Sequence, residues 1–387
     1  MRIYFDHNAT TPLHPDALEA TIRALRETFG NASSVHTFGQ QAKALLDEAR
    51  ARVAALIGAE PAEVVFTAGG TEADNFAIRG AAEALEARGR RHIVTSQIEH
   101  EAVLNTCRAL ERRGWRVTWV PPTQAGIVEP EAVAAALDDE TAIVSVMHAN
   151  NETGVVQPIA PIAEAAHRVG ALVHTDAVQS AGKIPVDVRE LGVDLLSLSA
   201  HKIAGPKGAG ALWIRRGVRI APILTGGRHE RNRRAGTENV PALAGFGVAA
   251  EIARTGLAEH AARLGTLRDR LEQGVLAAVP GAHVNGEGAP RVPNTSNISF
   301  DRVEAESLLI GLDLEGIAVS TGSACSSGTL EPSHVLRAMR LPQGRTQSAI
   351  RFSLGTPNTE AEVDRLLAVL PKLVEKLRSL TRVPAAR

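Results

Sequence analysis

Apolar residues along this chain occur mainly as short continuous runs, separated by stretches with helical periodicity. The runs cover residues 63–67, 92–96, 115–120, 141–148, 171–176, 193–199 and 208–214. Because they do not alternate with polar residues, they predict strands of a mostly parallel sheet that helices cover on both faces. We therefore expect an α/β fold with a seven-stranded sheet.

The helical stretches complete the expected organisation. The first helix carries four large apolar residues on one face, namely Leu18, Ile22, Leu25 and Phe29. A second helix should end at Gly58. The last third mixes short strands with helices, which is typical of an α+β unit. We expect a large domain over residues 13–257, and a smaller domain formed by residues 1–12 and 258–387 that carries Cys325.

Composition narrows the class of protein. Apolar residues make up 44% of the 387, charged residues 22%, and the net charge is −1. A near-neutral chain gives no reason to expect a nucleic-acid partner, and no apolar stretch is long enough to cross a membrane. Two cysteines and no signal peptide predict a soluble protein of the cytoplasm.

Candidate chemistry gathers where the predicted strands end. Gly69, Gly70 and Thr71 follow the strand at 63–67 and lead into a helix. The free N–H groups of a helix N-terminus suit a phosphate group, although an ordinary strand-to-helix turn would have the same pattern. This turn is neither a Walker A loop nor a GxGxxG motif.

Two further strands end in charged residues. Asp176 closes the strand at 171–176, and Lys202 follows the strand at 193–199. Taken alone, Asp176 could cap the next helix and Lys202 could extend into solvent. Ligands of open α/β sheets bind beyond the carboxyl ends of the strands. An anion cradle, a carboxylate and a lysine at one such edge are what pyridoxal phosphate requires, because the lysine bonds its aldehyde and the carboxylate pairs with its pyridine nitrogen.

Six motifs in order carry a family resemblance. They are TAGGTEADN, HANNETG, HTDAVQSAGK, SAHKIAGPKG, RRAGTEN and STGSACSSGTLEPSHVLRAM. Together they resemble the cysteine desulfurases of the NifS/IscS type, which are fold-type I, pyridoxal-phosphate-dependent homodimers in the class V aminotransferase family. The resemblance runs from residue 6 to residue 355, and its details are most similar to the nitrogen-fixation form. It implies release of sulfur from L-cysteine, giving L-alanine, and transfer to an iron–sulfur scaffold protein or another acceptor.

The resemblance also implies a role for each matched residue. Lys202 would bond the cofactor, His100 would stack on its ring and assist proton transfer, and Cys325 would take the sulfur as a persulfide. The other cofactor contacts would come from Gly70, Thr71, Asp176, Gln179, Ser199 and His201, and from Thr237 of the neighbouring subunit. Asn151 and Arg351 would bind the substrate.

The surroundings of the two cysteines differ. Cys325 lies among glycine and serine residues, as expected of an exposed, reactive thiol in a polar loop or of a plain linker. Cys107 lies among apolar residues of a helix and should be core. No dedicated metal site is predicted; by family analogy, Cys325 would contact an iron–sulfur cluster only transiently.

Two other functions remain open. A selenocysteine lyase or another aminotransferase or lyase of the same fold would use the same cofactor, but transamination needs no loop thiol. A non-catalytic scaffold would lack the cofactor altogether. The residues do not name the sulfur acceptor, and they do not separate a role dedicated to nitrogenase from a general one.

Overall fold

The central element of the computed structural model is a seven-stranded sheet, and residues 2–321 and 332–380 are described. Strands β3 to β7 all run parallel to one another, whereas β8 is antiparallel to both β2 and β7. The order across the sheet is β2 (Val64–Thr67), β8 (Gly210–Ile214), β7 (Leu195–Ser199), β6 (Leu172–Asp176), β5 (Thr141–Ser145), β3 (His92–Ser96) and β4 (Arg116–Val120). The prediction of a mostly parallel sheet is confirmed.

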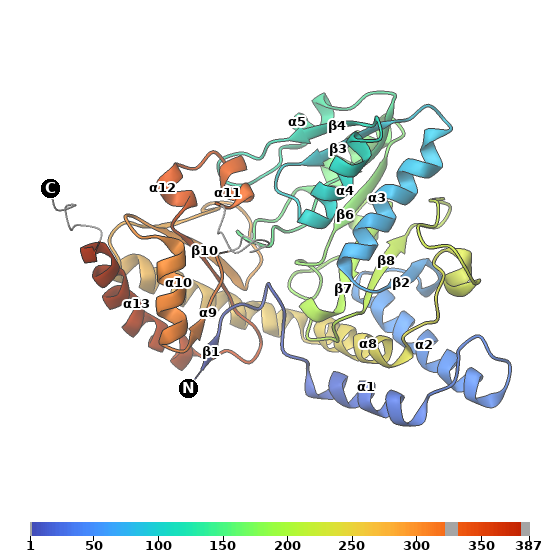
Figure 1. The fold of residues 1–387 in the computed structure, drawn as a ribbon, viewed down its shortest axis with the longest axis horizontal. Helices are drawn as coiled ribbons and strands as arrows, with labels where there is room; N and C mark the ends of the chain where they lie inside the picture. The colour runs from blue at the N-terminus through green and yellow to red at the C-terminus, as the bar shows by residue number, and fades with distance from the viewer. Residues whose placement is uncertain (1, 322–331, 381–387) are drawn as a thin grey trace.

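Helices pack against both faces of this sheet (Figure 1). Successive residues of a strand point to opposite faces: Ile143 joins the apolar cluster of α3 (Gly70–Glu86) and α4 (Glu101–Glu111), and Val144 joins the other. The second cluster includes residues of α2 (Thr37–Leu56), α6 (Ile159–Arg168) and α8 (Val240–Thr255). Burial on both faces explains why the strand sequences are continuously apolar.

A separate apolar cluster joins the N-terminus to the last third of the chain. It combines Ile3 and Phe5 with residues from 264 to 374. Its strands are β1 (Ile3–Tyr4) beside β11 (Ile317–Ala318), and β9 (Ala282–Val284), β10 (Thr295–Phe300) and β12 (Ala349–Ser353) in an antiparallel sheet. Its long helices are α9 (Leu257–Ala278), α10 (Ala305–Leu314) and α13 (Glu360–Leu380).

Short helices complete the chain: α5 (Pro130–Ala135), α7 (Val188–Leu191), α11 (His334–Ala338) and α12 (Gln343–Thr346). As expected, α2 is followed by Gly58, whose φ of +66° favours glycine. Cys107 is fully buried, as predicted. Within the described ranges, no helix combines the length and apolarity that a membrane span needs.

Helix α1 (Pro15–Glu27) forms where expected, but its large apolar residues do not face the core. The buried residues of α1 are Ala17, Ala20 and Ala24, and α1 packs on α8 through this side. Leu18 and Leu25 are exposed. Small residues allow two helices to approach closely, so Leu18 and Leu25 point toward solvent while Ile22 is half-buried.

Candidate active site

The carboxyl ends of β2 and β7 lie at one edge of the sheet. Gly210 of the antiparallel strand β8 pairs with Thr67 at the end of β2 and with Ser199 at the end of β7. This register places the turn after β2 beside the residues that follow β7. The convergence predicted from the sequence is therefore a consequence of β8 lying between the two strands.

The turn after β2 forms the start of α3. Gly69 precedes the helix with a φ of +156°, a value that side chains rarely allow. A Cβ at Gly70 would lie 3.0 Å from Val178 Cγ2 and 3.5 Å from Ser199 Cβ. The N–H groups of the first helical turn have no partners within the helix. Glycine thus keeps the backbone donors of the turn open to an anion.

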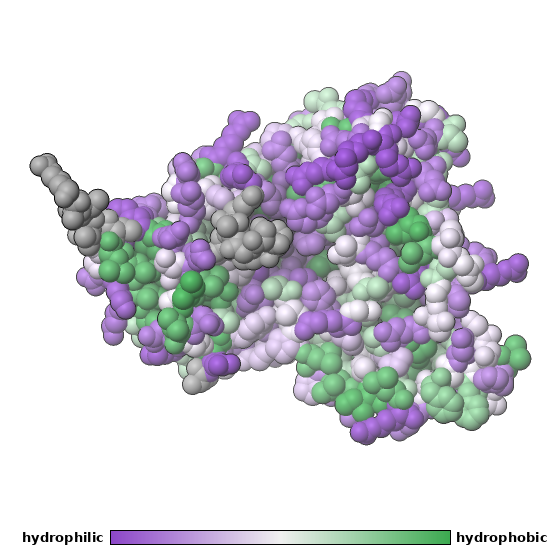
Figure 2. Space-filling model, viewed as in Figure 1, coloured by the Kyte–Doolittle hydropathy of each residue, from purple (hydrophilic) through white to green (hydrophobic). Residues whose placement is uncertain are grey.

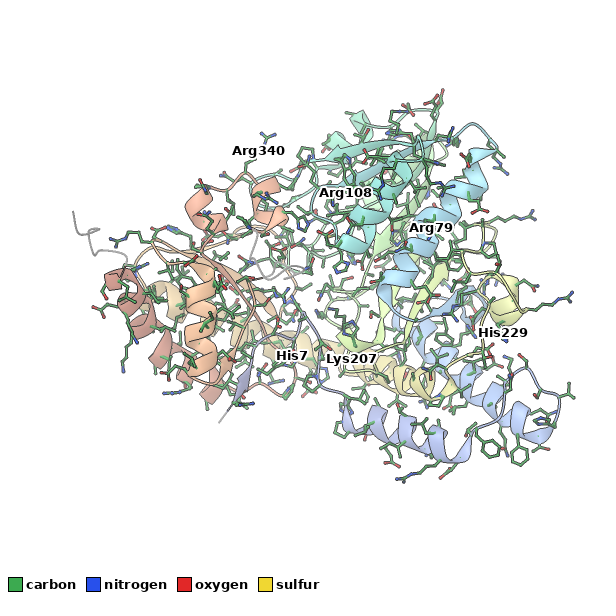
Figure 3. All side chains as sticks on the ribbon, viewed as in Figure 1. His7, Arg79, Arg108, Lys207, His229 and Arg340 are labelled. Atoms are coloured by element: carbon green, nitrogen blue, oxygen red, sulfur yellow. The ribbon has the colours of Figure 1, made fainter. Side chains whose placement is uncertain are left out.

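These donors face a hollow of about 790 Å³. Gly70, Thr71, Ser199 and His201 all line it. Arg79 on α3 and Lys207 after β7, both labelled in Figure 3, line the same hollow and add positive charge. Burial, followed by the charges of Lys202 and Lys207, lowers the pKa of His201 to about 4, so its imidazole is neutral at pH 7.

Asp176 lies buried at the end of β6. Its Oδ1 accepts a hydrogen bond from the N–H of Val178 at 2.8 Å, so it shapes a turn rather than capping a helix. Burial raises the pKa of Asp176, while the charges of His100 and Lys202 oppose that rise. A cationic ring nitrogen would stabilise the ionised carboxylate in the same way.

Lys202 follows β7 in the short helix η2 (Ala200–Lys202). Its Nζ donates to the carbonyl oxygens of Asn8 and Ala9, at 2.6 and 2.7 Å. Burial, followed by the charge of Arg351, lowers the pKa of Lys202 to about 8. At pH 7 roughly a tenth of this amine is therefore uncharged and nucleophilic, far more than of an ordinary surface lysine.

Arg351 reaches the same region from β12. Its guanidinium is buried and donates to the carbonyl of Asn151 at 3.0 Å and to Asp6 at 2.7 Å. Its Nε has no hydrogen-bond partner among the described residues. The structure thus brings Arg351 and Asn151 together, and it leaves a buried cationic donor that suits a carboxylate.

The remaining predicted residues lie at the margins of this region. His100 is exposed and caps α4, where its Nδ1 accepts from Ala102 N at 3.1 Å. It lines a hollow of about 520 Å³ together with Thr71. Thr237 is exposed on the loop before α8 and does not line the hollows of about 520 and 790 Å³. Cys325 lies outside the described residues.

Sequence reasoning missed two groups of polar residues here. Asn8 bonds Lys202, Gln179, Lys183 and the backbone of Asn151. Its signal was the asparagine of DHNATT at residues 6–11, the segment where the family resemblance begins.

The second group consists of buried carboxyls. Burial, and then Asp176, raises the pKa of Asp74, and burial raises that of Glu99 to about 8. Nothing in the sequence distinguishes them from surface acids.

The residues present fit pyridoxal phosphate. The cradle after β2, which a Cβ at position 70 would crowd, suits its phosphate. The buried Asp176 suits its ring nitrogen, and the lowered pKa of Lys202 suits attachment to its aldehyde. In the described part of the chain, no group of three or more metal-binding side chains is placed to hold an ion.

Comparison with known proteins gives the same result. The family model for class-V aminotransferases matches residues 3–366. The chain is 51% identical over 381 residues to a cysteine desulfurase of Gluconacetobacter diazotrophicus, covering 98% of this chain and 95% of that protein. A solved NifS-like protein superposes with a TM-score of 0.91 at 40% identity, covering 97% of this chain and 100% of that one.

A second solved structure, SspA in complex with cysteine, is 33% identical with a TM-score of 0.80, covering 92% of this chain and 99% of that one. The fold is therefore the expected fold-type I arrangement. The chain belongs to the pyridoxal-phosphate-dependent class-V aminotransferase family and, within it, to the cysteine desulfurases.

Proposed function

We propose that this protein removes sulfur from L-cysteine and receives it on Cys325. The products are L-alanine and a persulfide. The C–S bond of cysteine breaks, its S–H group replaces the thiol proton of Cys325, and a proton takes the place of sulfur on carbon. No external oxidant is needed. The observation that carries the proposal is the buried amine of Lys202, whose pKa is lowered to about 8, beside Arg351 and a phosphate cradle.

The geometry of the sheet edge supports the proposed cofactor contacts. Thr71, Ser199 and His201, with the backbone at Gly70, would hold the phosphate from the walls of one hollow. Asp176 would pair with the ring nitrogen and Gln179 with the ring hydroxyl, while His100 would stack on the ring. Pyridoxal phosphate, when bound, withdraws electrons from the α-carbon of an amino acid and so labilises its bonds.

The substrate would be held by its carboxylate. Arg351 has a donor without a partner in the described part of the chain, and Asn151 lies beside it. A guanidinium binds a carboxylate through two parallel hydrogen bonds, which would orient the amino acid. Lys202, partly neutral at pH 7, would then take the α-proton.

Exposed apolar residues on another part of the chain support a homodimer. Large apolar residues are exposed on α1 and just before and within α2, with Phe29 at 73% and Val35 at 90%. Figure 2 shows hydrophobic surface over α1 and α2 at the lower right. The other members are Leu18, Leu25 and Phe38, and we call the five the α1–α2 face. In a dimer, Thr237 would reach the phosphate of the neighbouring subunit.

The wider setting is also proposed. Two cysteines are compatible with the reducing cytoplasm. The acceptor would be an iron–sulfur scaffold protein, with supply to nitrogen fixation as the specialised role.

The separate cluster of residues 3–5 and 264–374 supports domains at 13–257 and at 1–12 with 258–387.

Replacing Cys325 by serine tests the assigned acceptor. Release of alanine and sulfide from L-cysteine should fall at least about a hundredfold, because serine cannot hold sulfane sulfur. The visible absorbance of the cofactor should persist. Cys107→Ala, which changes the other thiol, should keep the activity. Full desulfurase activity in Cys325→Ser would refute the assignment.

A further inference from the structure

Lys183 is a buried lysine that the proposed reaction does not use. It lies at the end of the turn after β6, and only 9% of its surface is exposed. Its Nζ donates to Gln179 Oε1 at 2.5 Å and to Asn8 Oδ1 at 3.0 Å. Burying an amine costs free energy unless it is hydrogen-bonded, so both bonds are structurally important.

Two hydrogen bonds, one from Lys183 and one to Asn8, fix both polar atoms of the Gln179 side-chain amide. Gln179 Nε2 donates to the carbonyl oxygen of Asn8 at 2.9 Å, while its Oε1 accepts from Lys183. A main-chain carbonyl can only accept a hydrogen bond. The amide nitrogen must therefore face Asn8, and the amide oxygen must face the amine. This orientation follows from chemistry and does not depend on telling N from O by position.

Asn8 is fixed in turn by neighbours of unambiguous type. Its Nδ2 donates to the carbonyl of Asn151 at 3.1 Å, and its backbone N donates to Ser353 Oγ at 3.0 Å. Its Oδ1 also accepts from Asn294 at 3.1 Å. Asn8 is 2% exposed, so these bonds do not compete with bulk water. Lys183 therefore contacts a rigid partner.

The surroundings of the Lys183 amine are compatible with these two hydrogen bonds. Burial, followed by the charges of Lys202 and Arg351, places the pKa of Lys183 well below its ordinary value. His7, labelled in Figure 3, is a further titratable neighbour, and it lines a hollow of about 360 Å³ with Lys183 and Lys202. Whether neutral or charged, the amine carries at least two N–H donors, which match the two acceptors.

We propose that Lys183 is a positioning residue: it holds the amide of Gln179 so that the remaining N–H of Nε2 is presented to the cofactor. One N–H of Nε2 is used by Asn8, and Oε1 faces Lys183, so among the contacts of the described residues the second N–H of Nε2 is the group left for the cofactor. The ring oxygen of pyridoxal phosphate is then bound as an acceptor, in its ionised form. This inference rests on the proposed contact between Gln179 and that oxygen.

A double-mutant cycle tests the inference with pyridoxal phosphate as the probe. The variants are Lys183→Met, Gln179→Ala and the two combined, with Lys372→Met on the surface of α13 as the matched lysine control. The readouts are the dissociation constant of the cofactor and the pH dependence of its visible band. Neither needs desulfurase activity, and thermal unfolding of each apo variant checks folding.

We expect Lys183→Met to weaken cofactor binding about tenfold and to shift the band toward the protonated ring oxygen, because Oε1 loses its donor. In the Gln179→Ala background, Lys183→Met should have no further effect. Lys183→Gln keeps an N–H donor, so its dissociation constant and visible band should lie closer to those of the parent. It replaces Lys183→Met if that variant does not fold. Lys372→Met should match the parent.

Two results would contradict different claims. Equal losses from Lys183→Met with and without the Gln179 side chain would show that Lys183 does not act through Gln179, and would overturn the inference. An unchanged constant and band in Gln179→Ala would instead overturn the proposed contact between Gln179 and the ring.

Discussion

The edge of the seven-stranded sheet and the α1–α2 face depart from ordinary burial in opposite directions. At the edge, ionisable groups such as Asp176, Glu99 and Lys183 are buried. On the α1–α2 face, large apolar residues such as Phe29 are exposed. Buried ionisable groups are costly and rare outside functional sites. A large exposed apolar patch usually marks an interface.

The physical contexts explain the difference. At the sheet edge, hydrogen bonds within this chain compensate for burial, as where Asp176 at the end of β6 accepts from Val178 N in the turn that follows. Phe29 and Phe38 contact each other, with ring centroids 5.2 Å apart, but both remain exposed. One region thus holds its unusual residues with this chain alone, while the other would need a second copy.

The largest expected effect comes from Lys202→Ala. Activity should fall by about a thousandfold or more, since the covalent link to the cofactor and the base would both be lost. Borohydride reduction of the parent followed by peptide mass spectrometry should place the label on Lys202. Lys207→Ala, at an exposed lysine nearby, should keep the label there. Label on Lys183 instead would show that the wrong buried lysine was assigned.

Next comes the α1–α2 face, which Phe29→Asp should disrupt. Burying an aromatic side chain contributes about 1.5–3 kcal/mol, and a two-fold interface counts each change twice. The dimer should therefore dissociate about a hundredfold or more readily. Sedimentation over a concentration series measures this. Leu314→Asp, at an apolar residue of α10 that is 83% exposed, should leave the dimer intact; the reverse result would place the interface elsewhere.

The next effect, expected from Glu99→Gln, concerns stability rather than activity or association. Burial raises the pKa of Glu99 from 4.5 to about 8, so between these values the folded protein binds more protons than the unfolded chain. The free energy of unfolding should therefore fall as pH rises from 5 to 8, by an amount on the order of several kcal/mol. Chemical denaturation should show a flatter pH dependence in Glu99→Gln. An unchanged slope would mean that Glu99 ionises normally.

The smallest effect is expected from Arg351→Gln. Burial is the main cause of the lowered pKa of Lys202, and the charge of Arg351 is the next. Without that charge the ammonium form is less disfavoured, so the pKa should rise by a fraction of a pH unit. The rate at which pyridoxal phosphate attaches to the apo protein should rise with pH through a midpoint near 8. In Arg351→Gln this midpoint should lie at a higher pH. A midpoint that moves down would contradict this electrostatic account.

Much of the fold could be predicted because it rests on local pattern. The continuous apolar runs predicted the seven strands, and Gly58 correctly marked the end of α2. The placement of α1 could not be predicted, because periodicity identifies an apolar face without saying what covers it. Its small residues Ala17, Ala20 and Ala24 pack on α8, which lies far away in sequence.

The candidate site divides in the same way. Residues in distinctive motifs, such as Asp176 and Lys202 at strand ends, could be found from the sequence. Asn8 and Lys183 could not, because a hydrogen bond between residues 175 positions apart has no local signature.

The sequence by itself determined the strands, most helices and the types of side chain available for chemistry, because these depend on neighbours along the chain. The tertiary structure decided which of those side chains meet and how acidic they are. A pKa depends on burial and on charges that folding brings close. The pKa of Lys202 becomes unusual only because the folded chain buries its amine and places Arg351 nearby.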